Sequence, residues 1–377
     1  MKKRDKLILT AGPSMSTKEE AYVLDAVRNG WNDQWNGYLS RLEKAFANFI
    51  GVKFAMATSS CTGALHVTLK GLGIQAGDEV LVPEITWVAT AAAVTYVGAK
   101  PVFVDVDPHT LCMDPQSARK KITGKTKAIM PVHNYGQVCD MAQICRLAKE
   151  FKLFLIEDAA PALGATFNNQ PVGSFGNAAT FSFQGAKIIT CGEGGMFLTN
   201  EEALYQRVKK INDHGRSLTK ALWNDEIGHK YKMSNLQAAL ALAQFERLNE
   251  FISKKRQIFH WYEERLKDVE EIILSKEREN SYGIYWMSTI ILRDSCFLTR
   301  EQFMKNLKDW NIDSRPVFYP LSSMPMFTSQ SSQNPIAYNT AQKGINLPSG
   351  VLLEENDIDY ICDIIHHILK KGSYVTA

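Results

Sequence analysis

The sequence has no long apolar run and no large excess of charge of either sign. Its apolar stretches stay well below the roughly 20 residues that a membrane-spanning helix needs, and the run "LILTA" near the start is too short for a signal peptide. The 43 Lys+Arg against 40 Asp+Glu leave a net charge of +3, too small for 377 residues to indicate nucleic acid or a membrane surface as a partner. We therefore expect a cytoplasmic protein with neither kind of partner.

Metal and disulfide motifs are also missing. The seven cysteines are scattered, odd in number and without a C-x-x-C pair, which favours reduced thiols over a disulfide framework or a zinc site. The sequence contains no H-E-x-x-H motif, so nothing indicates a zinc hydrolase. We expect no metal.

What is present between Phe54 and Asn200 is an alternation of short apolar runs with amphipathic stretches. Strands are expected at Glu79–Pro83, Pro101–Val106, Ala128–Val132, Leu153–Asp158, Ala179–Phe183 and Gly195–Thr199, and helices at Gly63–Leu72, Trp87–Tyr96 and Met141–Phe151. This alternation predicts an α/β fold whose mostly parallel, mixed sheet lies between helices. Functional groups in such sheets collect beyond the carboxyl ends of the strands.

After Asn235 the pattern changes to that of a smaller α+β domain. One long amphipathic helix is expected over residues 236–269, followed by a strand at Ile284–Leu292 and helices at Thr299–Trp310 and Asp357–Lys371. The polar, turn-rich segment Ser322–Pro335 is expected to be an exposed loop. The predicted division is an N-terminal arm (1–14), a large domain (15–245) and a small C-terminal domain (246–377).

One lysine, in "FSFQGAKIITCGEGGMFLTN", lies between an apolar strand pattern and a cluster of glycines. Most lysines at such places are simply surface residues. The alternative is an amine placed to form a Schiff base in a partly desolvated site, which would make Lys187 catalytic. The glycines would then form the turn that takes the chain back past Lys187 into the next strand.

Three further segments could complete a site around that amine, although each has an ordinary structural explanation. In "IEDAAPALGA", Asp158 could cap a helix or could hold the protonated ring nitrogen of a pyridine cofactor. The small hydroxyl residues that lead into the helix at Cys61 and Thr62 could be simple caps or could cradle a phosphate, with Ser182 in reach. Trp87 could pack in the core or stack on a planar cofactor.

Together, in this order, these segments resemble the fold-type-I pyridoxal 5'-phosphate enzymes, and specifically the DegT-type sugar-nucleotide aminotransferases. The resemblance covers nearly the whole chain and implies a large and a small domain, pyridoxal phosphate as cofactor, and Lys187 as the Schiff-base lysine. "IGHKYKMSNLQAALALAQFERL", "SRPVFYPLSSMPMF" and "GINLPS" resemble the GDP-perosamine synthases within that family. Dehydratase members have histidine at the lysine position, so Lys187 argues against dehydration.

The sequence departs from the family pattern at four positions. Cys61 stands in place of the glycine of the phosphate cradle, where a backbone amide would still serve. Pro161 replaces a polar residue that contacts cofactor or substrate and offers no donor. Lys230 replaces an asparagine that reaches the phosphate from the partner subunit, and Lys232 replaces an arginine.

The resemblance implies a homodimer with shared active sites. In it Lys230 of one chain would reach the phosphate of the other, and we expect this charge to have no partner within its own chain. Arg315 and Tyr319 are the expected substrate contacts. His133 and the pair His366–His367 are expected to be structural.

The implied activity is transfer of an amino group from glutamate to a keto-sugar nucleotide, namely GDP-4-keto-6-deoxy-D-mannose, to give GDP-perosamine. One alternative is an aminotransferase for another keto-sugar nucleotide or a keto-cyclitol. A second is a cofactor-binding homologue without turnover, which Pro161 and Lys230 would favour. The complete set of Lys187, Asp158, Trp87, Thr62 and Ser182 opposes it.

Overall fold

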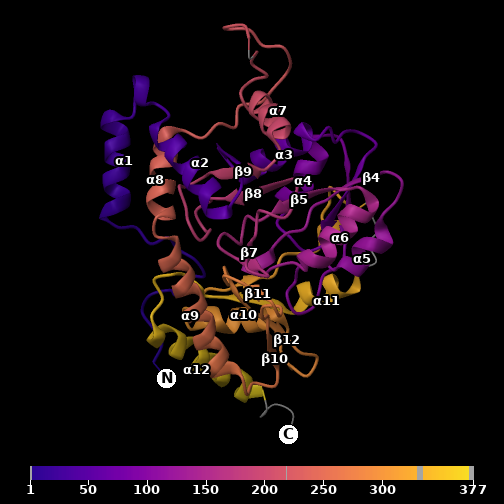
Figure 1. The fold of residues 1–377 in the computed structure, drawn as a ribbon. Helices are drawn as coiled ribbons and strands as arrows, with labels where there is room; N and C mark the ends of the chain where they lie inside the picture. Colours follow the sequence, from indigo (N-terminus) through magenta and orange to yellow (C-terminus); the bar gives the residue numbers. More distant parts are fainter. Residues whose placement is uncertain (1, 218, 329–333, 373–377) are drawn as a thin grey trace.

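The computed structural model describes residues 2–217, 219–328 and 334–372, and it confirms the predicted α/β fold. A seven-stranded sheet lies among helices in the upper part of Figure 1, and a smaller four-stranded sheet with its own helices lies below it. Within the described residues no helix has the length and apolar character needed to cross a bilayer.

The large sheet has the order β1-β9-β8-β5-β4-β2-β3, with six strands in one direction and β9 reversed. Its strands are β1 (Phe54–Thr58), β2 (Glu79–Pro83), β3 (Lys100–Val104), β4 (Thr126–Ile129), β5 (Phe154–Asp158), β8 (Ala178–Ser182) and β9 (Gly195–Thr199). Two of the predicted strands, β2 and β9, have the expected bounds, and the others differ by one to three residues at an end. The reversal of β9 follows from the glycine-rich turn, because β8 and β9 are neighbours in the sheet and the connection between them carries Lys187.

Helices surround this sheet. They are α1 (Thr17–Asn29), α2 (Gly37–Ile50), α3 (Cys61–Gly71), α4 (Ala89–Tyr96), α5 (Pro115–Lys121), α6 (Met141–Phe151), α7 (Glu202–Asn212) and α8 (Asn235–Phe245), with short 3-10 turns η1 (Asn32–Gln34) and η2 (Asn134–Gly136). Helix α6 has the predicted bounds because Asp140 caps its first turn by accepting the Gln143 amide at 3.0 Å.

The smaller part of the molecule is built around the second sheet, of order β10-β12-β14-β13. Its elements are α9 (Leu248–Leu266), β10 (Ile272–Leu274), β12 (Ser288–Leu292), α10 (Arg300–Asp309), β13 (Arg315–Pro316), η3 (Leu321–Ser323), α11 (Pro335–Lys343), β14 (Gly344–Leu347) and α12 (Glu355–Gly372). A third, three-stranded sheet pairs β11 (Ser281–Tyr282) with β6 (Thr166–Phe167) and β7 (Gln170–Pro171), and so joins the two parts.

One expectation for the second half is wrong, and another holds only in part. The single helix over residues 236–269 is two helices, because the backbone leaves the helical region at Arg247 (φ −103°, ψ 5°) between α8 and α9. The segment Ser322–Pro335 is exposed at most of its described residues, as expected, but Ser322, Phe327 and Asn334 are buried. The carboxylate of Glu84 accepts hydrogen bonds from the Ser322 amide at 2.8 Å and from Asn334 Nδ2 at 2.5 Å, which holds both ends of this segment inward. Residues 329–333 of it lie outside the described residues.

The break between α8 and α9 coincides with the predicted boundary at residues 245–246. The large sheet uses residues 54–199 alone and the four-stranded sheet residues 272–347 alone. We therefore propose the division into a large domain (15–245) and a small domain (246–377).

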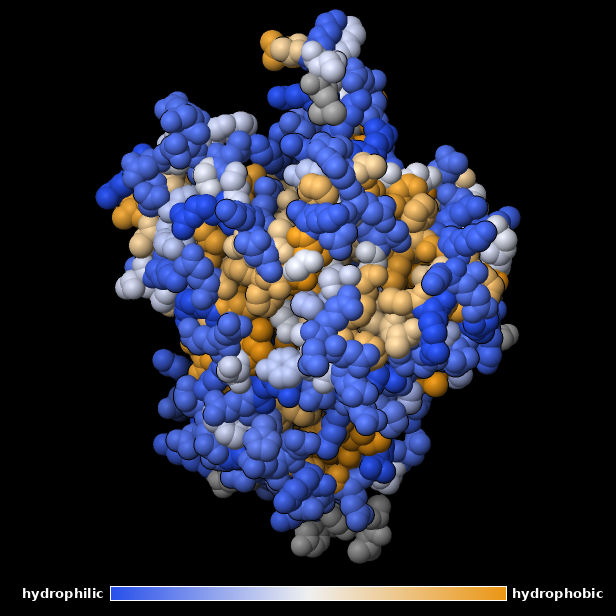
Figure 2. All heavy atoms as spheres, viewed as in Figure 1, coloured by the Kyte–Doolittle hydropathy of each residue, from blue (hydrophilic) through white to orange (hydrophobic). Residues whose placement is uncertain are grey.

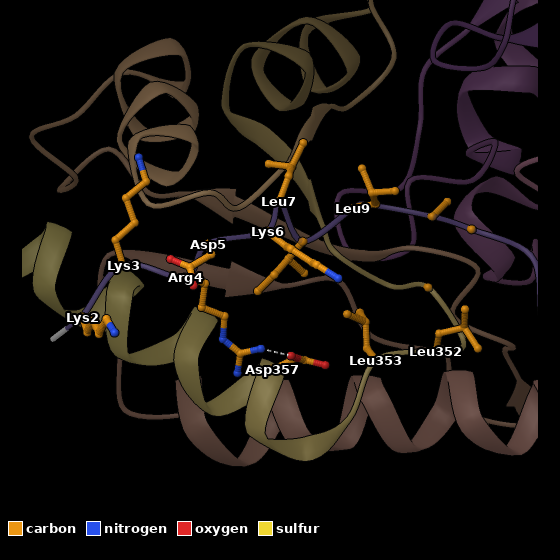
Figure 3. Close-up of a pocket in the computed structure, with 14 residues that line it drawn as sticks. Lys2, Lys3, Arg4, Asp5, Lys6, Leu7, Leu9, Leu352, Leu353 and Asp357 are labelled. Atoms are coloured by element: carbon orange, nitrogen blue, oxygen red, sulfur yellow. Dashed lines mark hydrogen bonds and ion pairs between the residues drawn. The ribbon is translucent and has the colours of Figure 1, made fainter.

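The N-terminal arm, described from residue 2, runs mainly along the proposed small domain, and its last residue meets the large one, where the Ser14 carbonyl accepts a hydrogen bond from Gln244 Nε2 at 2.8 Å. Ile8 donates its amide to Asn311 and accepts that of Asp313, both at 2.9 Å, and Arg4 pairs with Asp357 of α12 (Figure 3). The arm covers a hollow of about 680 Å³ that is lined largely by its own lysines and leucines and holds none of the predicted site residues.

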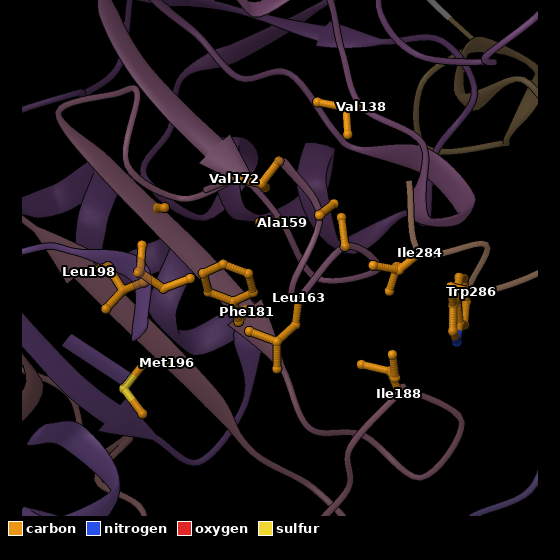
Figure 4. Packing of buried hydrophobic residues seen from close by; sticks show 14 of the residues in the cluster. Val138, Ala159, Leu163, Val172, Phe181, Ile188, Met196, Leu198, Ile284 and Trp286 are labelled. Carbon is orange, nitrogen blue, oxygen red and sulfur yellow. The ribbon is translucent and has the colours of Figure 1, made fainter. Parts of the chain in front are cut away.

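The main core lies on the sheet side of the glycine-rich turn. Phe181, Met196 and Leu198 of β8 and β9 are fully buried, and Figure 4 shows them with Ile188, Ile284 and Trp286 at the far edge of the same cluster. The residues on either side of Lys187 are therefore fixed by core packing, so the lysine is carried on a rigid support.

Candidate active site

A cavity of about 470 Å³ opens beyond the carboxyl ends of β2, β4, β5 and β8. Six of the predicted site residues line it: Cys61, Thr62, Trp87, Asp158, Ser182 and Lys187. They come from five separate segments, which meet because parallel strands end at the same edge of the sheet.

Asp158 is the last residue of β5 and is 4% exposed. Thr90 Oγ1 donates to its Oδ2 at 2.8 Å, and the Ala160 amide donates to its Oδ1 at 3.2 Å. Burial raises the pKa of Asp158, while the hydrogen bonds and the charge of Lys187 act in the opposite direction. The carboxylate faces the cavity without a cationic group in direct contact among the described residues, so it is suited to receive a protonated donor from a bound molecule.

Lys187 is half-buried, and its amine reaches into the cavity from the connection between β8 and β9. Burial lowers the pKa of Lys187 to about 8, although the charge of Asp158 favours the ammonium form. Its Nζ lies 3.7 Å from the ring centroid of Trp286. About a tenth of the amine is thus neutral at pH 7, far more than for a lysine of ordinary pKa, and a nucleophilic or proton-transferring lysine requires this neutral form.

The N-terminus of α3 points at the same cavity. Ser60 caps this helix by accepting the Gly63 amide at 3.0 Å, and the first amides of a helix have no partner within it. The amides of Cys61 and Thr62 therefore stand at the cavity together with the hydroxyls of Thr62 and Ser182. This combination of helix amides and hydroxyls suits a phosphate group.

Close approach of β9 to this helix depends on Gly195. A Cβ at Gly195 would lie 2.5 Å from the Cys61 nitrogen and 2.6 Å from the Ser60 carbonyl carbon, so only glycine fits without displacing backbone. The Cys61 side chain is turned into the protein, where its Sγ lies 3.4 Å from Thr180 Oγ1. Burial raises the pKa of this thiol, so Cys61 stays protonated and its contribution to the cavity is its amide.

Aromatic residues form a wall of the cavity. Trp87, which precedes α4, is 63% exposed and lies at 5.9 Å and 50° from Phe318. Phe318 in turn stacks on Tyr135 at 5.2 Å and 23°. The exposed face of Trp87 is thus available to a planar ligand.

Three predicted site residues do not line this cavity. Arg315 pairs with Asp313 at 3.3 Å and is largely exposed, and Tyr319 receives a hydrogen bond of 3.4 Å from Arg300. Lys230 lies on the segment that leads to α8, and its Nζ donates to Asp213 at 2.7 Å. The expectation that Lys230 has no partner within its own chain is therefore wrong: the backbones of the two residues form a β-bridge, which places their side chains together.

His133 has the structural role expected of it. It is fully buried, its Nδ1 accepts the Cys139 amide at 3.3 Å, and its Nε2 lies 3.3 Å from Glu157 Oε2. Glu157 precedes Asp158 on β5 and points away from the cavity, where it accepts the amides of Gly173, Phe175 and Gly176. The side chain of Glu157 thus lies in the core and that of Asp158 at the cavity, as expected for adjacent residues of a strand.

Sequence reasoning missed several cavity residues: Thr86, Thr90, Asn134, Trp286 and Phe318. Thr90 could have been found, because it stands one helical turn after Trp87 and so shares its face. Asn134 could also have been found, because it is a polar residue that follows β4 at the same sheet edge where β5 ends at Asp158. Trp286 and Phe318 come from the small domain, and no local pattern predicts that they reach the cavity. Pro161 lines the cavity as well.

Comparison with known proteins agrees with this geometry. The chain is 42% identical over 354 residues to a GDP-perosamine synthase of Escherichia coli O157:H7, covering 94% of this chain and 96% of the relative. It is 40% identical to a GDP-perosamine synthase of Caulobacter vibrioides, covering 96% and 98%. A solved aminotransferase from Psychrobacter cryohalolentis has a TM-score of 0.91 at 27% identity, covering 96% and 98%.

The model of the DegT/DnrJ/EryC1/StrS aminotransferase family matches residues 13–366. The resemblance noted from the motifs around Lys187 and Asp158 is thereby confirmed, and with it the prediction of an aminotransferase. The chain belongs to the DegT/DnrJ/EryC1/StrS aminotransferase family.

Proposed function

We propose that the enzyme transfers an amino group from glutamate to GDP-4-keto-6-deoxy-D-mannose and so produces GDP-perosamine. The observation that carries the amino transfer is the placement of Lys187 and Asp158 in one cavity with the N-terminus of α3. The sugar nucleotide is supported by two relatives of 42% and 40% identity that are both named GDP-perosamine synthase.

The enzyme is a pyridoxal phosphate-dependent transaminase, and the residues of the cavity fit this cofactor. The Cys61 and Thr62 amides with Ser182 would hold the phosphate, Asp158 the protonated ring nitrogen, and Trp87 one face of the ring. The buried carboxylate of Asp158 has two hydrogen-bond donors and no cation in contact, so a pyridinium N–H would complete its environment. When bound, pyridoxal phosphate supplies an electron sink for the carbon that loses or gains a proton.

The chain's own residues would bind and orient the reacting molecules and would transfer a proton. Lys187 Nζ, with its pKa lowered to about 8, would accept a proton from one carbon and return it to another. Asp158 would keep the ring nitrogen protonated, which a buried carboxylate with fixed hydrogen bonds does well. Trp286 and Phe318 line the cavity opposite the sheet and would exclude water from the reacting atoms.

A homodimer with shared sites is part of this proposal. Exposed apolar residues lie on α1 and η1, where Leu24, Val27, Trp31 and Trp35 are 48 to 57% exposed. Leu222 and Ile227, at 97% and 84%, lie on the loop between α7 and α8 that projects from the top of Figure 1. Figure 2 also shows apolar side chains gathered across the middle of the visible face, over the large domain. Apolar side chains gathered on a surface mark sites of protein association, which supports a partner of the same kind.

Lys230 is at the end of that projecting loop, which supports its proposed role at the phosphate of the partner subunit. The Asp213 carboxylate would then orient its amine rather than neutralise it. Arg315 and Tyr319 remain the proposed substrate contacts, at the edge of the small domain outside the cavity wall. With seven unpaired cysteines, the enzyme is proposed to work in the cytoplasm.

The proposal is tested by mixing the purified enzyme with glutamate and GDP-4-keto-6-deoxy-D-mannose and identifying the product by mass spectrometry and NMR. The amino-sugar nucleotide should form only with pyridoxal phosphate present, and the visible absorption band of the enzyme should bleach on addition of glutamate. Preferential amination of a dTDP-linked keto-sugar over the GDP-linked one would refute the proposed substrate but not the proposed amino transfer. An enzyme whose spectrum no amino donor changes would refute the reaction itself.

A further inference from the structure

Trp286 contacts the amine of Lys187, although it belongs to the small domain. Its ring centroid lies 3.7 Å from Lys187 Nζ, and its side chain lines the cavity. An aromatic face this close to an amine favours the ammonium form over the neutral form. The position of Trp286 therefore bears directly on the protonation of Lys187, which the charge of Asp158 also influences.

The sheet does not hold Trp286 in place. It lies between β11 and β12, and the ladder of β12 with β14 begins only at Ser288. Three other contacts hold it: its Nε1 donates to the Ala186 carbonyl at 2.7 Å, its ring stacks on Tyr135 at 6.3 Å and 8°, and its own carbonyl accepts a hydrogen bond of 2.8 Å from Lys255 Nζ.

Lys255 is unusual among these contacts because it is a buried amine. It lies on α9, is 4% exposed, and makes its second hydrogen bond, of 2.5 Å, to the Ser349 carbonyl. Among the described residues no carboxylate pairs with it, and burial lowers the pKa of Lys255 to about 7. An apolar residue of the same size would avoid the desolvation of this amine but would leave the Trp286 and Ser349 carbonyls without this donor, so the lysine serves the two segments that it joins.

Lys255 donates to the backbone carbonyls of Trp286 and Ser349, which lie just before β12 and just after β14. The Ser349 side chain in turn accepts the amide of Ser288, the first residue of β12. Lys255 thus ties α9, the segment before β12 and the loop after β14 to one another. Because the hydrogen bond from Lys255 goes to the backbone carbonyl of Trp286, it holds the main chain at this residue independently of the indole side chain.

We propose that Lys255 is a positioning residue that holds Trp286 against the amine of Lys187. Through this contact the small domain sets how readily Lys187 takes up and releases a proton. The functional importance of the contact rests on the role proposed above for Lys187, but the contact itself can be measured without cofactor or substrate.

The test is trace acetylation of the full-length, cofactor-free protein with acetic anhydride over a series of pH values. Mass spectrometry of the peptide that contains Lys187 reports how much neutral amine is present at each pH. Lys255→Met should increase the acetylation of Lys187 at pH 7 about threefold, the size expected when a cation–π contact is lost. Trp286→Leu should give the same increase, and the double variant should exceed neither single one. Acetylation of the exposed Lys53 should stay unchanged and serves as the internal control.

The sign of the change separates positioning from a direct charge effect. Removal of a positive charge near Lys187 would by itself raise the pKa of Lys187 and reduce its acetylation. Lys255→Arg keeps a charged donor and should restore most of the normal labelling. Unchanged or reduced labelling in Lys255→Met, or additive effects in the double variant, would overturn the proposal. Should Lys255→Met fail to fold, Lys255→Gln can replace it, because glutamine retains an amide donor. This variant should give an intermediate increase in the acetylation of Lys187, and no increase would overturn the proposal. Failure of the transamination assay would leave this result unaffected, so the two proposals fail separately.

Discussion

Thr90 Oγ1 donates a hydrogen bond of 2.8 Å to Asp158 Oδ2, which ties the first turn of α4 to the end of β5 inside the cavity. Thr90 is 1% exposed, so this bond is shielded from water. Because it lowers the pKa of a carboxylate that burial would otherwise raise, it helps to keep Asp158 ionised.

Thr90→Val should weaken the enzyme without unfolding it. Valine keeps the shape of threonine but removes the donor, and a hydrogen bond to a charged group contributes about 1.5–3 kcal/mol. We expect a loss of roughly 10- to 100-fold in kcat/KM, measured by steady-state kinetics with excess cofactor. The matched control is Thr95→Val on the same helix, where an exposed hydroxyl bonds only to the Ala92 carbonyl, and its activity should be normal.

Asp158→Asn and Glu157→Gln should have opposite kinds of effect, although the residues are neighbours on β5. Asp158→Asn removes the charge that faces the cavity, and we expect kcat to fall on the order of 10²–10³-fold with little change in thermal stability. Glu157→Gln affects a carboxylate that accepts three backbone amides in the core, so it should lower the melting temperature more than kcat. Similar kinetic losses in both variants would argue against the cofactor role of Asp158.

Gly195→Ala should weaken retention of the cofactor. The added Cβ would lie 2.5 Å from the Cys61 nitrogen, so the first turn of α3 must shift and its amides lose their alignment. We expect the dissociation constant for pyridoxal phosphate, measured by fluorescence titration, to rise about 10-fold or more, the effect of losing one charge-assisted hydrogen bond. Gly124→Ala is the control, since nothing lies within 4 Å of its added Cβ. Equal affinities in the two variants would contradict the assignment of this helix to the phosphate.

Lys187→Met should change how stability depends on pH. In the folded chain the pKa of Lys187 is about 8, below the 10.5 of the unfolded chain, so folding disfavours its proton. Between these two values the unfolded state binds more protons, and stability of the wild type rises with pH. The variant lacks this dependence: its gain over the wild type should be greatest below pH 8 and should shrink as the pH approaches 10.5. Urea unfolding of the cofactor-free proteins checks this, with Lys53→Met as the control, and a gain independent of pH would contradict it.

Lys187→Ala and Lys230→Ala should complement each other if the sites are shared. Each variant alone should be poorly active at limiting cofactor: the first lacks the reacting amine, and the second lacks a phosphate contact and leaves Asp213 with only its longer ion pair to Arg216, at 3.8 Å. In a mixed dimer one site carries both changes and the other neither, so activity should return after subunit exchange. No recovery after exchange has been verified by native mass spectrometry, or a monomeric active enzyme, would rule out the shared site.

The sequence by itself determined most of the fold and the residues at the strand ends. Apolar runs and their spacing gave β2, β9 and α6 with their observed bounds, because local pattern and burial agree there. In a parallel sheet the strand ends meet at one edge, so Asp158, Ser182 and the segment at Trp87 had to converge once the strands were placed. Lys187 was identifiable from a separate signal, because the cluster of glycines that follows it predicts a turn between two strands.

Only the tertiary structure decided which distant residues complete the site. Trp286 and Phe318 come from the small domain, and their place in the cavity depends on how that domain packs on the large one rather than on any local pattern. The same is true of the ion pair between Lys230 and Asp213, of the helix break at Arg247 and of the inward segment held by Glu84. Periodicity records which face of an element is buried, but not which partner covers it, and the protonation of Lys187 depends on that partner.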